Sequence, residues 1–407
     1  MSYTTNEKAI LQELAKQYVE IATHPANAER RNRARDINDL KPRRPIVWIH
    51  EIPWHEMNID NKLTTTCESE MARQMEWHLR MMLFRWEYIQ ADMVADNFFP
   101  IPKAYSSTGM GLGVDEDMIA TDTNNYIVSH HYKDQLDTME KVLALKEPIV
   151  TAHPEQDEER KAFAEEAFGD ILPVKLRGHY IYHAPWDEIP RYRGVTPIMY
   201  DIVDNPELLH ATVKTWTDYK FSTMKQMEKL NLLSNDTDDL HCTPPYTDDL
   251  PQGGGLKNIW FRCMAQMFSD VSPVTWKEFE LDYLMPLAKE CGLVYYGCCE
   301  AIENKIDLLR TIPNLRKIGV PTRSNPESCA AQIKGDYVYA YKPNPAFVAT
   351  TFDPKPVREE IARVIKTCKE HNCAYEFVLK DISTVGYKPQ NLIDWTNVVM
   401  ETIGENY

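Results

Sequence analysis

Residues 294–300 read VYYGCCE, a short apolar and aromatic run that ends abruptly in two thiols and a carboxylate. A helical pattern of apolar residues follows at once in 302–309. This order predicts a buried strand, a turn and a helix. In parallel α/β folds the carboxyl ends of the strands carry the chemistry, which makes Cys298, Cys299 and Glu300 candidate functional residues. The two cysteines also suit a purely structural role as small core residues.

Short apolar runs alternate with longer amphipathic segments along the chain. The pattern predicts strands at 45–49, 93–99, 178–183, 231–235, 293–297, 317–320, 337–341 and 375–379. It predicts helices at 6–35 with a break at Pro25, then at 68–92, 136–145, 155–168, 206–230, 258–270, 276–290, 326–333, 356–371 and 390–404. Such alternation, without a nucleotide-binding opening, favours a (β/α)8 TIM barrel. We expect residues 1–40 to form an N-terminal helical extension and 41–407 to form the barrel.

Composition narrows the class of protein. The 407 residues carry a net charge of −16, which argues against nucleic-acid binding, since that requires a basic surface. Nine scattered cysteines and an N-terminus without a signal pattern indicate reduced thiols in the cytoplasm. No apolar run approaches the roughly 18 residues of a membrane span. A small-molecule substrate fits these properties.

Five motifs resemble the uroporphyrinogen decarboxylase-like superfamily. They are RPIVWI at 44–49, YGCCE at 296–300, IPNLRKI at 312–318, YKPNPA at 341–346 and LKDIST at 379–384. The resemblance covers most of 40–407 and implies a (β/α)8 barrel. True decarboxylases of that superfamily follow the first strand with an arginine-rich segment that grips a polyanion. Here residues 50–56 read HEIPWHE, which would repel one.

The departure points to the other branch of the superfamily, the cobamide-dependent methyltransferases. The resemblance implies transfer of a methyl group from a small donor to a corrinoid held by a separate corrinoid protein. Residues 239–244 begin like a cobalt-ligating Asp-x-His-x-x-Gly motif, but Pro244 replaces the glycine, so the chain itself is not expected to carry cobalamin. We expect a methoxylated aromatic donor, with a thiol or methylamine still open. Relatives often form dimers, which leaves a homodimer open too.

Some methyltransferases of this branch hold zinc through a His-x-Cys pair and a distant cysteine. Tyr296 and Cys298 occupy the place of that pair, so the histidine is missing. A substitute zinc site is predicted where His241 and Cys242 meet the stretch that carries Cys298, Cys299 and Glu300, because the two loops are expected to open on the same face of the barrel. His241, Cys298 and Cys299 are its expected ligands. The alternative is that His241 is an ordinary loop histidine.

Acid assistance is needed to make an alkoxide or phenolate leave. His50 and Glu51 follow the first strand, and one of them is expected to face the site; Glu300 is a further candidate. Lys342 and Asp381 end two late strands and are expected either to brace the barrel or to orient the substrate oxygen. Four aromatic residues near predicted strand ends are candidates for holding the substrate: Trp54, Tyr105, Trp186 and Tyr296.

Two other functions remain open on the sequence. A decarboxylase-like enzyme acting on a small carboxylic acid predicts a cationic pocket. Its candidate residues are Arg177, Arg191, Arg193 and Arg323. A non-catalytic barrel that binds an aromatic or tetrapyrrole ligand predicts tight binding without turnover.

Overall fold

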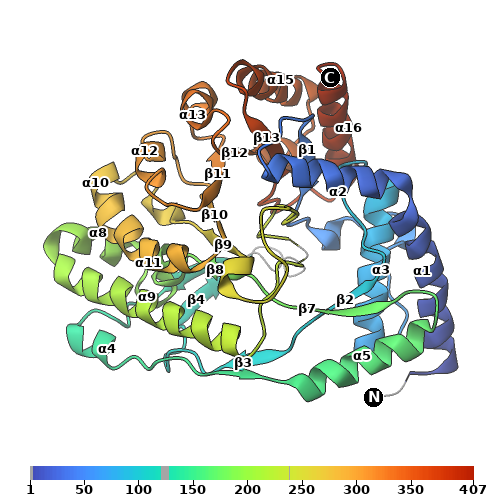
Figure 1. The fold of residues 1–407 in the computed structure, drawn as a ribbon, viewed down its shortest axis with the longest axis horizontal. Coiled ribbons are helices and arrows are strands. Elements are labelled where there is room, and N and C mark those ends of the chain that lie inside the picture. Colours follow the sequence, from blue (N-terminus) through green and yellow to red (C-terminus); the bar gives the residue numbers. More distant parts are fainter. Residues whose placement is uncertain (1–2, 121–127, 238) are drawn as a thin grey trace.

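A computed structural model describes residues 3–120, 128–237 and 239–407. Its centre is a seven-stranded sheet in the order β1-β13-β12-β11-β10-β9-β8, and every neighbouring pair is parallel (Figure 1). The strands are β1 (Ile46–Ile49), β8 (Ile181–His183), β9 (Trp260–Cys263), β10 (Leu293–Tyr296), β11 (Leu315–Pro321), β12 (Val338–Lys342) and β13 (Ala374–Leu379). The predicted α/β fold with a parallel sheet is confirmed.

Strands and helices alternate regularly in the C-terminal half. The longer helices are α8 (Val195–Asp204), α9 (Pro206–Lys229), α11 (Asp282–Glu290), α13 (Pro326–Ile333), α15 (Pro354–Glu370) and α16 (Gln390–Gly404). Helix α15 shows why they form where they do. Asp353 caps its first turn by accepting a hydrogen bond from the Lys355 amide at 2.9 Å, and Pro354 occupies the first helical position. Apolar residues at helical spacing then face the sheet.

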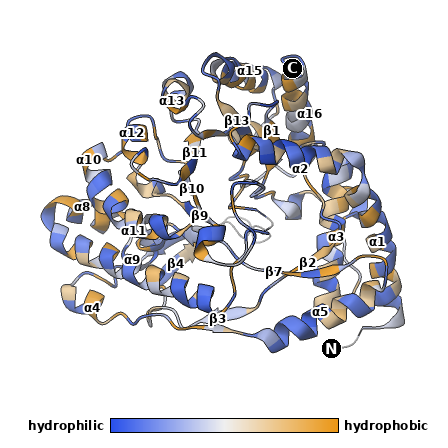
Figure 2. Cartoon of the chain, in the orientation of Figure 1, coloured by the Kyte–Doolittle hydropathy of each residue, from blue (hydrophilic) through white to orange (hydrophobic). Residues whose placement is uncertain are grey.

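The N-terminal region forms its own helical layer beside the sheet (Figure 1). It contains α1 (Thr5–Thr23), α3 (Glu70–Tyr88) and α5 (Pro154–Phe168), which share a separate apolar cluster. Helix α2 (Pro25–Asn38) starts at the predicted proline break, is largely hydrophilic (Figure 2), and covers the amino ends of β1 and β12 through Ala34 and Ile37. No helix in the described part of the chain is long and apolar enough to cross a membrane.

Smaller elements complete the fold. Strand β2 (Phe99–Pro102) pairs with β7 (Val174–Arg177), β3 (Tyr105–Ser107) with β6 (Val150–Ala152), and β4 (Glu116–Ile119) with β5 (Ser129–Tyr132). The short helices are α4 (Met139–Leu143), α6 (Pro185–Glu188), α7 (Pro190–Arg193), α10 (Pro273–Trp276), α12 (Ile306–Leu309) and α14 (Ala346–Ala349). A π-helical turn, Lys277–Leu281, joins α10 to α11.

Three local predictions were wrong. The helix expected at 258–270 is instead strand β9, because WFRC at 260–263 is a short run buried on both faces, which periodicity alone does not distinguish from helix. The strand expected at 93–99 starts only at Phe99, as β2. The strand expected at 231–235 is reduced to a single bridge between His179 and Leu233.

Side chains alternate between the two faces of the sheet. Tyr296, Ile318 and Phe377 belong to the face that packs against the helices. Arg262, Tyr295, Lys317 and Glu376 belong to the other, inner face, because they are offset by one residue from that set in paired strands. Gly319 permits a close approach on this sheet, since a Cβ there would lie 2.5 Å from the Gly297 carbonyl oxygen.

Residues 239–250 form a segment that fills the inner face of the sheet; we call it the inserted segment. Leu240 and Leu250 pack against Trp260, Leu293 and Tyr295. Its centre is anchored by Thr243, whose hydroxyl donates to Glu376 at 2.7 Å and accepts from Lys317 at 3.0 Å. Lys317 and Glu376 themselves form a fully buried ion pair at 2.8 Å.

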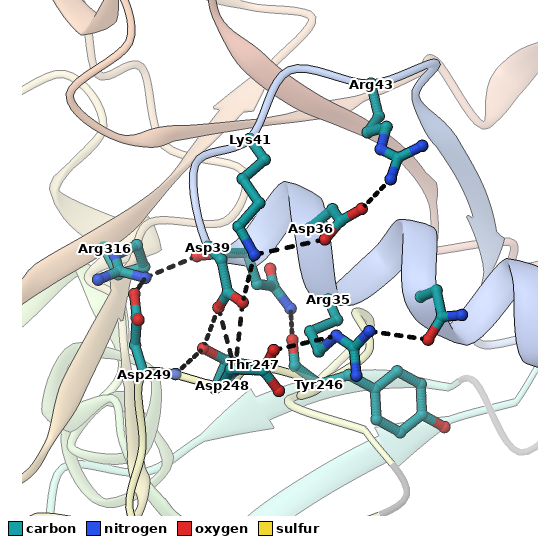
Figure 3. Close-up of polar contacts among 12 residues, drawn as sticks. Arg35, Asp36, Asp39, Lys41, Arg43, Tyr246, Thr247, Asp248, Asp249 and Arg316 are labelled. Atoms are coloured by element: carbon teal, nitrogen blue, oxygen red, sulfur yellow. Dashed lines mark hydrogen bonds and ion pairs between the residues drawn. The ribbon is translucent and has the colours of Figure 1, made fainter.

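The far end of the inserted segment is clamped to α2 and β11 (Figure 3). The Thr247 hydroxyl donates to Asp39 at 2.5 Å, and Arg35 pairs with Asp248 at 3.3 Å. Arg316, at the start of β11, pairs with Asp249 at 2.7 Å. With one end held by this clamp and the centre held by Thr243, the other end, residues 239–242, is fixed at the carboxyl edge of the sheet.

Candidate functional site

Polar and sulfur side chains gather at the carboxyl ends of three strands. His50 and Glu51 follow β1, Cys298 and Cys299 follow β10, and Lys380 and Asp381 follow β13. The Asp381 amide donates to Glu51 Oε2 at 2.8 Å, and Cys299 Sγ lies 3.0 Å from Asp381 Oδ2. Residues named from distant motifs therefore meet at one edge of the sheet, as expected for parallel strands.

His50 is held by the inserted segment. Its Nε2 atom lies 2.9 Å from Asp239 Oδ2, and Asp239 Oδ1 accepts a hydrogen bond from the Cys242 amide at 3.2 Å. Burial disfavours the charged imidazole, but the Asp239 carboxylate and the Cys242 sulfur outweigh it and raise the pKa of His50 to about 10. The surroundings of this ring therefore favour positive charge.

One donor atom each from His50, Glu51 and Cys242 lies within 4.8 Å of the other two. Of the residues that the structure describes, these form the group whose spacing suits a metal ion. The sequence left open which of His50 and Glu51 faces the site; both contribute. Glu51 does so because its backbone takes a left-handed conformation, with φ 53°, which turns its side chain toward the same side as His50.

Cys298 lies in a different environment. Its sulfur accepts a hydrogen bond from the Lys380 ammonium at 2.8 Å. The Cys299 thiol, the His241 ring and the charges of Arg262 and Lys380 lower the pKa of Cys298 well below its usual range, against the opposing effect of burial. The arrangement stabilises a thiolate. Of the predicted metal ligands, His241, Cys298 and Cys299 are thus brought together, but Cys298 already has a cation beside it.

Lys342 and Asp381 do not pair with each other, contrary to the predicted brace. Lys342 Nζ donates to the Tyr295 hydroxyl at 2.5 Å, whereas Asp381 lies 3.1 Å from the Lys380 ammonium. The Arg262 guanidinium stacks over the Tyr295 ring at 4.0 Å from its centroid. The inner face below the site is therefore lined by cations gathered around one tyrosine.

Glu300 is fully buried, and its carboxylate stabilises the backbone around Cys298. Its carboxylate accepts from the Cys298 amide at 2.8 Å and from the Ala265 amide at 3.1 Å. It therefore fixes the turn after β10 and connects it to the residue that follows β9. Both of its oxygens are engaged, which places this predicted acid in the support of Cys298.

A cavity of about 440 Å³ opens beside His50 and Glu51. Trp48, Trp54, Met81 and Met82 give it an apolar wall. Trp54 is held there by edge-on contacts with Trp77 and Phe84. The remaining lining residues are Tyr18, Ile49, Ile52, His78, Arg85, Met93, Val94, Asp96, Pro100, Asp239 and Tyr246. An apolar chamber with a few convergent polar groups is typical of a small-molecule site.

Of the four aromatic residues predicted to hold substrate, the cavity contains Trp54. Trp186 is buried in the core, and its indole donates to the Phe279 carbonyl at 3.1 Å. Tyr296 lies on the helix-facing side of the sheet, where its hydroxyl accepts from Trp276 at 3.0 Å. Tyr105 is exposed on β3, next to His179.

The cationic pocket predicted for a decarboxylase is not assembled among the described residues. Arg177 pairs with Asp96 and Asp236, Arg193 pairs with Asp134 and Asp201, and Arg323 pairs with Asp270. Arg191 is exposed on α7. None of these arginines lines the cavity beside His50.

Several site residues were not predicted from the sequence: Asp239, Arg262, Tyr295 and Lys380. Alternation along β9 and β10 would have indicated Arg262 and Tyr295, since it places them on the face opposite Tyr296. Lys380 stands beside the predicted Asp381 at the end of the same strand. The sequence drew attention to the stretch that contains Asp239 and Cys242, but it did not predict their contacts with His50, because their positions depend on contacts made along the whole inserted segment.

Comparison with known proteins identifies the fold. No protein-family model matches the chain, and no curated protein matches its sequence. A methyltransferase of known structure from Methanosarcina mazei superposes with a TM-score of 0.50 at 10% sequence identity. The match covers 93% of this chain and 99% of that one, so the two share their fold over nearly their full lengths.

Proposed function

We propose that this chain is a methyltransferase that removes the methyl group of a methoxylated aromatic compound and passes it to the corrinoid of a separate protein. In this proposal the parallel sheet is the (β/α)8 barrel of the uroporphyrinogen decarboxylase-like superfamily, in its methyltransferase branch. The shared fold with the Methanosarcina mazei methyltransferase and the motifs at 44–49, 296–300 and 341–346 support it.

The cavity beside His50 carries the proposal. Its wall of Trp48, Trp54, Met81 and Met82 suits an aromatic ring, which gains from edge-on aromatic and sulfur contacts. Its volume of about 440 Å³ would be largely unfilled by methanol or a methylamine. His50, Glu51 and Asp239 are among its polar lining groups, and in this proposal the ether oxygen of a bound ring lies beside them.

The polar groups beside His50 would have to stabilise the oxygen atom from which the methyl group is removed. When the methyl carbon–oxygen bond breaks, its electron pair stays on the oxygen, which leaves as a phenolate stabilised by a nearby positive charge, or as a phenol if it takes up a proton. The surroundings of His50 favour positive charge, so this part of the cavity stabilises the departing oxygen. The apolar wall orients the ring and excludes water from the reacting bond.

A bound corrinoid on the partner would supply the nucleophile that accepts the methyl group. The residues of this chain do not fit cobalt ligation. Asp239 is engaged with His50 and Cys242, and His241 lies against Tyr182 and Cys298. Asp239 and His241, the two residues of the 239–244 stretch that match the cobalt-ligating motif, are thus already engaged in contacts within this chain. This supports a corrinoid held by a separate protein.

The donor class can be tested with the purified chain and reduced free cobalamin as the methyl acceptor. Four donors would be compared at equal concentration: 2-methoxyphenol, methanol, trimethylamine and methanethiol. The proposal predicts the highest kcat/KM for 2-methoxyphenol, with one phenolic product formed per methylcobalamin. Faster transfer from one of the smaller donors would contradict the aryl ether assignment, and no transfer from any donor would contradict methyl transfer.

A further inference from the structure

The group formed by His50, Glu51 and Cys242 combines a nitrogen, an oxygen and a sulfur donor. Cys242 is fully buried, and His50 and Glu51 are half-buried. The donor atoms lie within 4.8 Å of one another, close enough for small side-chain movements to bring all three onto one ion. Two of these residues follow β1, and the third comes from the inserted segment.

The two ring nitrogens of His50 have environments that suit a histidine bound to a metal ion. Its Nε2 is occupied by Asp239, whereas its Nδ1 is buried without a hydrogen bond of standard geometry, and Cys242 is the other side chain that interacts with the ring. A buried ring nitrogen without a well-formed hydrogen bond is costly. Metal-binding histidines commonly have this arrangement, with one nitrogen on the metal and the other held by a carboxylate. Asp239 also fixes the Cys242 backbone, so a single carboxylate positions two of the three donors.

Backbone strain converges on the same place. Glu51, His241, Cys242 and Asp381 all have positive φ, at 53°, 47°, 86° and 56°. Such conformations cost roughly 1–3 kcal/mol each in a residue other than glycine. Two of these residues, Glu51 and Cys242, belong to the group whose donor atoms lie within 4.8 Å of one another. The Asp381 amide holds one oxygen of Glu51 and leaves the other available.

We propose that His50, Glu51 and Cys242 bind one Zn²⁺ ion, with Asp239 orienting His50 and the fourth coordination position open to the cavity. A mixed N, O and S set suits zinc, whereas the thiolate disfavours Mg²⁺ and Ca²⁺. Three protein ligands with one open position are typical of a catalytic zinc site. The role of this ion rests on the proposed function: it supplies the positive charge at the end of the cavity where the ether oxygen would lie.

The neighbouring thiols behave differently. Cys298 has the Lys380 ammonium at 2.8 Å, and Cys299 is directed to Asp381 at 3.0 Å. A metal ion at Cys298 would have to displace that ammonium or accept its repulsion. The structure therefore favours Cys242 as the metal-binding thiol, in place of the pair in the VYYGCCE stretch.

Metal titration of the full chain tests the site directly. The protein, stripped of metal and kept reduced, would be titrated with Zn²⁺ and, separately, with Co²⁺, whose thiolate charge-transfer band reports a Co–S bond. Wild type is expected to bind one equivalent and to show the band. Cys242→Ser should lose the band and weaken Zn²⁺ binding at least about 100-fold, whereas the matched variant Cys298→Ser keeps both.

Glu51→Gln serves as a second ligand variant, because this half-exposed side chain can be changed even if Cys242→Ser fails to fold. It is expected to retain the charge-transfer band and to bind Zn²⁺ at least about 10-fold more weakly. Absence of metal binding by wild type, or loss of the band in Cys298→Ser with its retention in Cys242→Ser, would overturn the site. One bound Zn²⁺ without methyl transfer from any donor would support the site and contradict only the proposed function.

Discussion

His50 Nε2 and Asp239 Oδ2 lie 2.9 Å apart, although one residue follows the first strand and the other begins the inserted segment. This contact joins the edge of the sheet to the peptide that fills its inner face. Because Asp239 also accepts from the Cys242 amide, the site forms only when the inserted segment is in place. The geometry of the candidate site and the packing of the sheet interior are therefore linked in this protein.

Asp239→Asn tests that link. The amide keeps the shape of the side chain but loses the charge that orients His50. We expect Zn²⁺ affinity to fall by about 10- to 100-fold, with thermal unfolding little changed. Competition with a chromogenic chelator measures the affinity. Asp248→Asn is a matched control, since Asp248 lies on the same segment but pairs with Arg35 at the far clamp. Equal losses in both variants would contradict the specific role of Asp239.

The buried pair Lys317–Glu376 should be important for stability. Glu376→Gln leaves the Lys317 ammonium buried without its counter-charge and replaces the charged acceptor of the Thr243 hydroxyl with a neutral amide oxygen. We expect the free energy of unfolding in urea to fall by about 3–5 kcal/mol. The double variant Lys317→Met/Glu376→Leu should recover much of that loss, because neither charge remains. A single variant that costs less than about 1 kcal/mol would show that the interior tolerates the unpaired lysine.

Trp54 should determine affinity for an aromatic donor. Trp54→Leu removes the ring that lines the cavity, and we expect KM for 2-methoxyphenol to rise about tenfold, which corresponds to about 1.4 kcal/mol. The kcat value should change less, since the polar groups beside His50 are intact. Tyr200→Leu, an exposed aromatic change on α8, provides the control. A KM unaffected by Trp54→Leu would place the donor outside this cavity.

His183 gives stability a pH dependence. Burial, and then the charge of Lys220, lower the pKa of His183 to about 3. The unfolded chain gains a proton at this residue near pH 6.5 while the folded chain does not, so stability falls as pH drops from about 6.5 toward 3. The contribution is about 1.4 kcal/mol per pH unit. His183→Gln should flatten the wild-type slope of unfolding free energy between pH 6.5 and 4.5; parallel slopes would contradict this.

The sequence predicted the parts of the site that depend on local pattern. The VYYGCCE stretch placed Cys298 and Glu300 after a buried strand, and the first apolar run placed His50 and Glu51 at a strand end. The sequence indicated Tyr296 as a site residue, but Tyr295 is the one that lies on the inner face of the sheet. Tyr296 packs against the helices on the opposite face. Strand β9 was missed because four buried residues carry too little periodicity to separate strand from helix.

The inserted segment could not be predicted from local pattern. Its conformation depends on partners far along the chain, among them Asp39, Glu376 and Arg316. His241 and Cys242 have positive φ, but they are not among the residue types that dominate turns, so the sequence did not indicate this conformation. The sequence therefore indicated His241 and its neighbour Cys242 as part of a possible metal site, while the group that Asp239 and Cys242 form with His50 became visible only in three dimensions.

The most direct test of methyl transfer follows the methyl group itself. The purified chain, reduced cobalamin and 2-methoxyphenol labelled with deuterium in its methoxy group would be combined, and the methylcobalamin formed would be examined by mass spectrometry. We expect a cobalt-bound methyl group that carries all three deuterium atoms, formed together with catechol. An unlabelled or absent methylcobalamin, with the aryl ether intact, would contradict methyl transfer from this donor.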